Sequence, residues 1–322
     1  MKTLLIIDIQ NDFLPGGSLA VTGGDAIISI VNELMPHYDH VVATQDYHPV
    51  DHGSFAANHS GKNVGEMIEL SGLPQILWPT HCVQVTTGSD FAEELQTQRF
   101  DTVFRKGTDP DIDSYSGFYD NGHLKSTGLA EYLKEIGTTE LHLAGLATDY
   151  CVKFTALDAI TEGFKTSIIL DAVRGVNLQP NDCDRAIKEM AEAGVILITS
   201  DDLLGETITL YRPTGPEELA LIEQSGRKAW PTRLPEQLIF YPVLNQEYAE
   251  QIAEEWNVPA SGCGYVTRFE VKRAFLKSYE RKIVGGKAHE ELWIPAEDLE
   301  ALNENIVGLI DVVKKFEPKS VK

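Results

Sequence analysis

The chain has 322 residues, of which 43% are hydrophobic and 24% are charged, and these proportions exclude a collagen-like or largely disordered protein. Lysine and arginine together number 27 against 49 aspartate and glutamate residues, so the formal net charge is −22. A surface of this charge repels polyanions, which disfavours nucleic acid and acidic membrane surfaces as partners.

The first two thirds of the chain alternate short apolar runs with longer helical patterns. This alternation is typical of a parallel sheet covered by helices, whose strands read as nearly continuous hydrophobic runs because both faces are buried. The sequence therefore predicts an α/β fold with a six-stranded parallel sheet flanked by helices. The predicted strands are Thr3–Ile9, His40–Gln45, Thr102–Arg105, Glu140–Ala144, Thr166–Leu170 and Val195–Thr199. The predicted helices are Gly24–Met35, Leu129–Ile136, Cys151–Glu162 and Asp182–Ala193.

The composition changes after a helix-like segment at Leu203–Leu210. The next six residues, Tyr211–Pro216, contain two prolines and a glycine, which predicts a helix stop and a linker. We expect one domain over residues 1–212 and a second, smaller α+β domain over residues 213–322. The elements expected in the second domain are strands at Gln237–Leu244, Gly264–Val271 and Glu291–Ile294 and helices at Glu247–Trp256 and Ala296–Phe316.

Neither the apolar runs nor the cysteines indicate export or membrane insertion. The first apolar run stops at Asp8, and no later stretch approaches the ~18 apolar residues that a membrane span requires. The four cysteines are too sparse for a disulfide framework and suit a reducing compartment. We therefore expect a cytoplasmic protein with no membrane partner.

Three reactive side chains stand where predicted strands end. Asp8 closes the first strand, Lys106 follows the third, and Cys151 begins the helix after the fourth. Ligands of open parallel sheets bind beyond the carboxyl ends of the strands, and a helix N-terminus lowers the pKa of a thiol. A single cysteine is more often a small buried hydrophobe. Together, however, the three residues fit a cysteine hydrolase in which Asp8 accepts the thiol proton and Lys106 orients the pair.

A second cluster has the composition of a metal site. Asp46 and His48 lie two residues apart in an extended segment, so their side chains point to the same side, and His81 joins them from downstream. Carboxylate and imidazole ligands suit Zn²⁺, with Fe²⁺ and Mn²⁺ as alternatives. His52 is a further ligand candidate. Histidine-rich loops also occur without metal, so the spacing alone leaves a metal-free interpretation open.

Several sequence stretches in residues 1 to about 210 are similar to one enzyme family. The segment resembles the nicotinamidase/pyrazinamidase branch of the isochorismatase-like cysteine hydrolases, and six matching stretches in the same order make chance resemblance implausible. These stretches are DIQNDFLPGGSLAV (Asp8–Val21), TQDYHPVDHGSF (Thr44–Phe55), LWPTHCVQ (Leu77–Gln84), FRKG (Phe104–Gly107), SYSGF (Ser114–Phe118) and GLATDYCV (Gly145–Val152).

The resemblance implies a role for each matching position. It implies a cis peptide bond between Leu146 and Ala147, which would aim the amides of Ala147 and Cys151 at the substrate oxygen as an oxyanion hole. The remaining implied roles fall into three groups. They are the catalytic triad Asp8, Lys106 and Cys151, the metal ligands Asp46, His48 and His81, and the pyridine-pocket residues Phe13, Trp78 and Tyr115.

The implied activity is that of a metal-dependent amidase in NAD salvage. Such an enzyme hydrolyses nicotinamide to nicotinate and ammonia through a cysteine thioester, with pyrazinamide as a second candidate substrate and one divalent metal ion, first of all Zn²⁺, as cofactor. Two alternatives stay open: a cysteine hydrolase for another small amide or carbamoyl compound, and a non-catalytic ligand-binding scaffold. A homo-oligomer is also left open.

Residues 213–322 lie outside this resemblance. Their sequence is similar to a small free-standing protein of no settled activity. Packing against the hydrolase, oligomerisation and metabolite sensing are three candidate roles for them.

Overall fold

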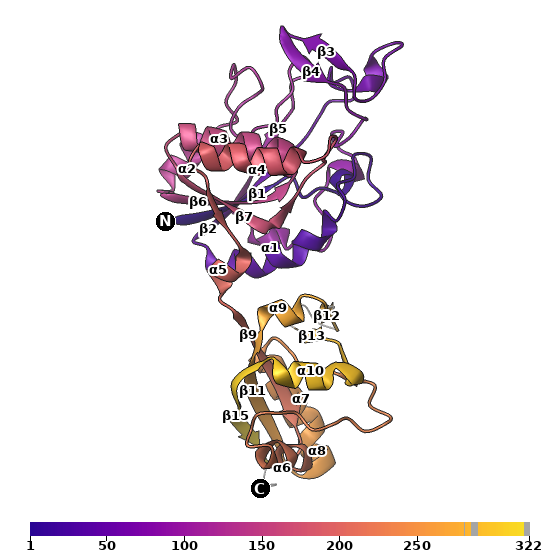
Figure 1. Cartoon of the computed structure of the whole chain (residues 1–322), viewed down its shortest axis with the longest axis vertical. Helices are drawn as coiled ribbons and strands as arrows, with labels where there is room; N and C mark the ends of the chain where they lie inside the picture. Colours follow the sequence, from indigo (N-terminus) through magenta and orange to yellow (C-terminus); the bar gives the residue numbers. More distant parts are fainter. Residues whose placement is uncertain (280, 285–288, 319–322) are drawn as a thin grey trace. The chain divides into compact units, whose positions relative to one another are not determined.

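A six-stranded sheet forms the centre of the N-terminal part of the chain in the computed structural model, which describes residues 1–279, 281–284 and 289–318 (Figure 1). Its strand order is β5-β2-β1-β6-β7-β8, and every neighbouring pair is parallel. The prediction of a six-stranded parallel sheet is confirmed. The strands are β1 (Lys2–Ile7), β2 (His40–Asp46), β5 (Thr102–Lys106), β6 (Glu140–Leu146), β7 (Lys165–Arg174) and β8 (Ile196–Ile198).

Helices cover both faces of this sheet (Figure 1). Side chains of α2, α3 and α4, among them Leu133, Ala156 and Met190, share one buried cluster with Leu5 and Leu143 of the central strands. Helix α1 lies on the opposite face (Figure 1). The central strands β1, β2 and β6 are therefore buried on both sides, which explains why they have no polar face. The helices are α1 (Ile28–Leu34), α2 (Leu129–Glu135), α3 (Lys153–Thr161), α4 (Asp182–Glu192) and α5 (Ser200–Leu204), and a separate hairpin is formed by β3 (Met67–Leu70) and β4 (Leu73–Ile76).

The chain divides into two compact units, Met1–Leu203 and Leu204–Lys322. The boundary expected after residue 212 falls inside β9 (Thr207–Thr214), which pairs along its whole length with β11 (Gly264–Lys272) of the second unit. The helix predicted at Leu203–Leu210 is wrong beyond α5. Residues 207–210 alternate between half-buried and buried positions, and this period of two places Ile208 and Leu210 in the core of the second unit.

The second unit contains mainly antiparallel sheets with short helices. Its central sheet has the order β15-β11-β9, and Trp230, Phe240 and Phe269 pack in its core. The remaining elements are α6 (Pro216–Gln224), β10 (Ile239–Phe240), α7 (Gln246–Ile252), α8 (Val258–Ser261), α9 (Arg273–Leu276), β12 (Arg281–Ile283), β13 (Glu290–Leu292), β14 (Ile294–Pro295), α10 (Leu299–Glu304) and β15 (Ile306–Phe316).

The long helix predicted at Ala296–Phe316 is wrong in its second half. Helix α10 ends at Glu304, and residues 306–316 form strand β15 against β11. This segment is rich in isoleucine and valine, whose branched side chains favour strands, and Gly308 adopts a φ of +84°, which a helix cannot contain. Among the described residues, no helix is long and apolar enough to cross a membrane.

Candidate active site

Four adjacent strands bring the candidate residues to one edge of the sheet. Asp8 directly follows β1, and Asp46 and Lys106 are the last residues of β2 and β5. Cys151 lies in a π-helical turn, Thr148–Val152, that follows β6 and leads into α3. Because β5, β2, β1 and β6 are neighbours in the sheet, residues separated by more than 140 positions in sequence meet at its carboxyl edge.

The turn that carries Cys151 is held by the segment after β7. The buried carboxylate of Asp149 accepts hydrogen bonds from the backbone N–H groups of Val176 and Asn177, at 2.9 and 2.8 Å. Near the end of β6, Gly145 has a φ of +127°, and a Cβ there would lie 2.0 Å from the carbonyl oxygen of Ile7. Only glycine therefore allows β6 to lie this close to β1 just before the cysteine.

Lys106 lies at the centre of the cluster. Its Nζ is 2.9 Å from Asp8 Oδ2, 2.7 Å from Asp46 Oδ1 and 3.4 Å from Cys151 Sγ, and it also donates to the carbonyl oxygen of Ser114. Burial alone would lower the pKa of Lys106, but the negative charges of Asp46 and Asp8 raise it well above its usual value. Lys106 is therefore a buried cation shared by two carboxylates.

Asp8 and Cys151 both lie in a dry environment. Burial raises the pKa of Asp8. Two contacts oppose this shift: the charge of Lys106, and a hydrogen bond of 2.7 Å that the Thr44 hydroxyl donates to Asp8 Oδ1. Burial raises the pKa of the Cys151 thiol well above its usual value, and the Lys106 charge offsets only part of this. The lowered thiol pKa predicted from the helix N-terminus is wrong, because removal from water outweighs favourable local charges. The same burial favours the uncharged thiol form of Cys151.

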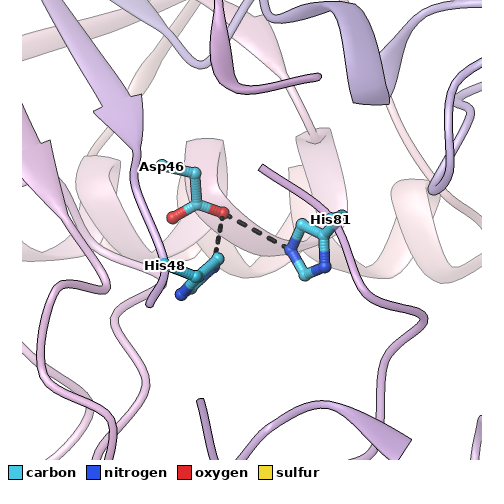
Figure 2. A group of neighbouring side chains, drawn as sticks. All are labelled: Asp46, His48 and His81. Atoms are coloured by element: carbon cyan, nitrogen blue, oxygen red, sulfur yellow. Dashed lines mark ion pairs between the residues drawn. The ribbon is translucent and has the colours of Figure 1, made fainter. Parts of the chain in front are cut away.

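Asp46, His48 and His81 form a second group (Figure 2), which Asp46 joins to Lys106. Asp46 Oδ2 lies 3.2 Å from His48 Nε2 and 3.6 Å from His81 Nε2, and all three side chains are buried. The Nδ1 atom of each ring donates to a backbone carbonyl, that of Gly107 at 2.9 Å for His48 and that of Pro79 at 2.8 Å for His81. Because Nδ1 donates to a carbonyl in each ring, Nε2 is the atom left to bind a metal ion, as in metal-ligating histidines.

The donor set therefore fits a divalent metal ion. One carboxylate oxygen and two imidazole nitrogens from these residues lie within 4.8 Å of one another. This number and type of ligands match open metal sites that keep further positions for water or substrate. His52 lies beside this set, with its ring 4.4 Å from that of His48, and burial lowers its pKa to about 4. The ligand atoms of His52, His48 and Asp113 also lie within 4.8 Å of one another, so His52 belongs to a second possible ligand group that shares His48 with the first.

One catalytic candidate, Cys151, and two metal-ligand candidates, Asp46 and His81, line the same cavity. Phe13, Trp78 and Tyr115 line it, as the resemblance implied, and the indole N–H of Trp78 donates to the Tyr115 hydroxyl at 3.1 Å. Ala147 and Cys151 also line it, and the peptide bond between Leu146 and Ala147 is cis. Four further residues line the cavity and were not predicted from the sequence. They are Leu19, Asp113, Tyr150 and Val176.

Two of the missed residues carried a usable signal. Tyr150 directly precedes Cys151, and its ring packs edge-on against Trp78 with centroids 4.9 Å apart. Asp113 precedes the SYSGF stretch and accepts a hydrogen bond from Gln75 at 2.9 Å. Leu19 and Val176 are ordinary apolar residues in loops, and nothing in their local sequence distinguishes them.

Comparison with known proteins extends over the whole first unit. The model of the isochorismatase domain matches residues 2–202. The chain belongs to the isochorismatase family. A nicotinamidase of Escherichia coli (strain K12) is 45% identical over 205 residues, which cover 62% of this chain and 96% of that protein. Residues beyond 202 form a separate region outside the family match.

Two solved structures are also similar to the family domain. A nicotinamidase/pyrazinamidase of Acinetobacter baumanii is 46% identical with a TM-score of 0.61, and the match covers 63% of this chain and 97% of that one. A pyrazinamidase of Pyrococcus horikoshii, solved in complex with zinc, is 36% identical with a TM-score of 0.51, and the match covers 62% and 98%. Both matches fit the six-stranded sheet described above.

Proposed function

We propose that the first unit is a metal-dependent amidase that hydrolyses nicotinamide to nicotinate and ammonia through a thioester on Cys151. The observation that carries the proposal is a single cavity lined by the cysteine, aromatic side chains and two of the three metal-ligand candidates, with Asp8 and Lys106 directly behind it. The nicotinamidases among its relatives support the same substrate. Such an activity would place the chain in pyridine-nucleotide salvage.

The aromatic walls suit a flat ring. Phe13, Trp78 and Tyr115 supply apolar surface, while Asp46 and His81 lie at the polar side of the cavity. A divalent ion held by Asp46, His48 and His81, with Zn²⁺ as first candidate and Fe²⁺ or Mn²⁺ as alternatives, would supply a Lewis acid for the pyridine nitrogen. Pyrazinamide carries the same carboxamide on a ring with two nitrogens, so we propose it as a second substrate.

The chain's own residues account for the proton transfers. Asp8 takes the proton from the Cys151 thiol as sulfur attacks the carboxamide carbon. The backbone N–H groups of Ala147 and Cys151 donate to the oxygen that becomes negative. Lys106 keeps Asp8 ionised before this step. The protonated Asp8 then gives its proton to the departing ammonia, which leaves a nicotinoyl thioester.

Hydrolysis of the thioester repeats the same chemistry with water. Asp8, ionised again, accepts a proton from a water molecule that attacks the thioester carbon. The same two N–H groups stabilise the second tetrahedral intermediate. Its collapse releases nicotinate and returns the proton from Asp8 to the sulfur of Cys151. The cycle consumes one water and leaves the enzyme unchanged.

An ammonia-release assay with nicotinamide and benzamide tests this function. Benzamide has the same shape but lacks the ring nitrogen, so we expect its kcat/KM to be at least about a hundredfold lower, because a polar site rejects an analogue that leaves its groups unpaired. Elemental analysis of the same sample measures the metal. Equal turnover of both amides would contradict recognition of the pyridine ring, and turnover of neither would contradict the amidase proposal.

Loss of one imidazole should remove the metal. We expect His81→Ala to lower the bound metal per chain by about tenfold or more under dialysis, because two ligands hold a divalent ion far less tightly than three. Elemental analysis after dialysis against a metal buffer measures this without relying on activity. His37→Ala, which removes an exposed histidine outside the cluster, is the matched control and should keep its metal. Equal metal content in both variants would contradict the ligand assignment.

A further inference from the structure

The segment that follows β1 holds the backbone beside two of the metal-ligand candidates. Gln10 and Asp12 belong to this segment, two and four residues after Asp8, and neither is itself a ligand candidate. The Gln10 side chain bonds to the backbone of Asp46, and the Asp12 side chain bonds to the residue that follows His81. Neither side chain takes part in the proposed proton transfers, so their hydrogen bonds call for a different role.

The Gln10 side chain replaces a missing strand neighbour of Asp46. Pairing of β1 with β2 ends at Ile7 and Thr44, so Asp46 lies beyond the last residue that β1 reaches. The Gln10 amide takes that place: its Oε1 accepts the Asp46 N–H at 2.8 Å, and its Nε2 donates to the Asp46 carbonyl at 2.8 Å. Gln10 is fully buried, so loss of its amide would leave the N–H and the carbonyl of Asp46 without these partners in a dry site.

A neighbouring turn fixes the orientation of the Gln10 amide. Nε2 also donates to the carbonyl of Ser89 at 2.8 Å, so both of its N–H groups are used. A flipped amide would point its oxygen at two carbonyl oxygens, which excludes that orientation. Asn11 binds the same turn, since its Nδ2 donates to the Thr87 carbonyl at 2.8 Å. Gln10 is therefore a rigid support for Asp46.

Asp12 holds the segment that carries His81. Its Oδ2 accepts the backbone N–H of Cys82, the next residue, at 2.7 Å. Cys82 has a φ of +46°, a conformation that costs free energy in residues other than glycine and persists only where neighbours hold it. The Cys82 carbonyl in turn accepts the N–H of His48 at 3.0 Å. Both backbone groups of Cys82 are therefore bound, and His81 is held in place beside it.

The other oxygen of Asp12 reaches a wall of the cavity. Oδ1 accepts the backbone N–H of Ser18 at 3.3 Å and the Ser18 hydroxyl at 3.1 Å. Ser18 directly precedes Leu19, which lines the cavity, and the Leu19 N–H donates to the Asp12 carbonyl at 2.9 Å. Asp12 therefore connects an apolar wall of the cavity to the segment that carries His81.

We propose that Gln10 and Asp12 are positioning residues for the metal ion. Gln10 fixes the backbone of Asp46, and Asp12 fixes the segment of His81, so Asp46 Oδ2 and His81 Nε2 lie 3.6 Å apart before an ion arrives. Ligands that are already arranged need not be ordered on binding, which raises the affinity. Groups that orient ligands typically change metal affinity by about tenfold to a hundredfold. The inference rests on the metal site of the proposed function.

Zinc binding by the metal-free, full-length protein tests this role without substrate. Competition with a coloured chelator measures the affinity for Zn²⁺. We expect Gln10→Met, which keeps the side-chain volume but removes the amide, and Asp12→Ala each to weaken binding by about tenfold or more. Asp12→Asn keeps an oxygen for the Cys82 N–H and should recover part of the loss. Urea unfolding of the same metal-free samples measures the free energy of unfolding.

Two matched variants separate positioning from a general loss of stability. Gln45 is also buried and donates to the same Ser89 carbonyl as Gln10, but its oxygen accepts from an arginine guanidinium rather than from the backbone of a ligand. Asp202 on α5 accepts a backbone N–H and a hydroxyl from Thr199, at 2.7 and 2.8 Å. Gln45→Met and Asp202→Ala should bind zinc like the unmodified protein, even where they unfold at lower urea concentrations.

The outcomes distinguish this inference from the proposed function. Unchanged zinc affinity in both Gln10→Met and Asp12→Ala would overturn the inference, and so would equal weakening in Gln45→Met and Asp202→Ala. His81→Ala is the reference for a lost ligand. If it binds zinc normally, the metal site is wrongly assigned and the inference fails with it. If it loses zinc while Gln10→Met and Asp12→Ala keep theirs, the site stands and only the positioning role is wrong.

Discussion

Replacing Cys151 with alanine should lower kcat for nicotinamide hydrolysis by about a thousandfold or more while leaving the fold intact. The thiol is the nucleophile that attacks the amide in the proposed route, and its side chain is small and buried, so alanine should fit the same space. Ammonia release measures the loss, and circular dichroism checks the fold. Cys183→Ala, which removes a partly exposed thiol that does not line the cavity, is the control and should retain activity.

The covalent step has its own test in hydroxylamine trapping. A nicotinoyl thioester on Cys151 should react with hydroxylamine to give nicotinohydroxamate, which forms at the expense of nicotinate. We expect this product from the unmodified enzyme and from Cys183→Ala, but not from Cys151→Ala. Full turnover by Cys151→Ala, or hydroxamate formation that does not depend on Cys151, would show that the reaction does not pass through this sulfur.

Replacing Lys106 with methionine should reduce both activity and stability. The variant leaves the buried carboxylates of Asp8 and Asp46 beside each other without their shared cation, and breaking a buried ion pair in this way costs about 3–5 kcal/mol. Urea unfolding of metal-stripped protein measures the free energy of unfolding. Lys165→Met removes an exposed lysine, 2.8 Å from Glu140, and should cost less than about 1 kcal/mol.

A second substitution shows whether charge causes the loss of stability. Adding Asp46→Asn to Lys106→Met removes one of the two unpaired charges and should restore part of the free energy of unfolding. Its free energy of unfolding, and not its activity, is the quantity compared, because Asp46 is also a metal-ligand candidate. Equal stability of Lys106→Met and Lys165→Met would mean that the buried cation contributes little to the folded state.

The sheet could be predicted from sequence because its strands are buried on both faces. Each strand is a short apolar run that composition locates more than distant partners do. A run such as Leu4–Ile7 has few possible structures other than a buried strand. The second unit was harder. Residues 306–316 follow closely after α10, so one helix was predicted through both segments, although the branched side chains of the second segment favour the strand that pairs with β11. Local sequence does not contain that partner.

The candidate site could be predicted in part for a related reason. Reactive residues at the ends of strands must meet at one edge of a parallel sheet, so Asp8, Lys106 and Cys151 could be grouped before any coordinates existed. The sequence could not show that Lys106 contacts both carboxylates. Its Nζ lies 2.7 Å from Asp46 Oδ1 and 2.9 Å from Asp8 Oδ2. It also could not show how deeply Cys151 is buried, which determines the direction of its pKa shift.

The order of the strands has a consequence for biosynthesis. Sulfur, acid and amine come from positions 151, 8 and 106, on or shortly after β6, β1 and β5, which come together only in the finished sheet. A ribosome must therefore have translated the chain well beyond β6 before Cys151 can meet its proton acceptor. Prematurely terminated products that lack this strand carry the acid and the amine but no nucleophile, so they are inert toward amides.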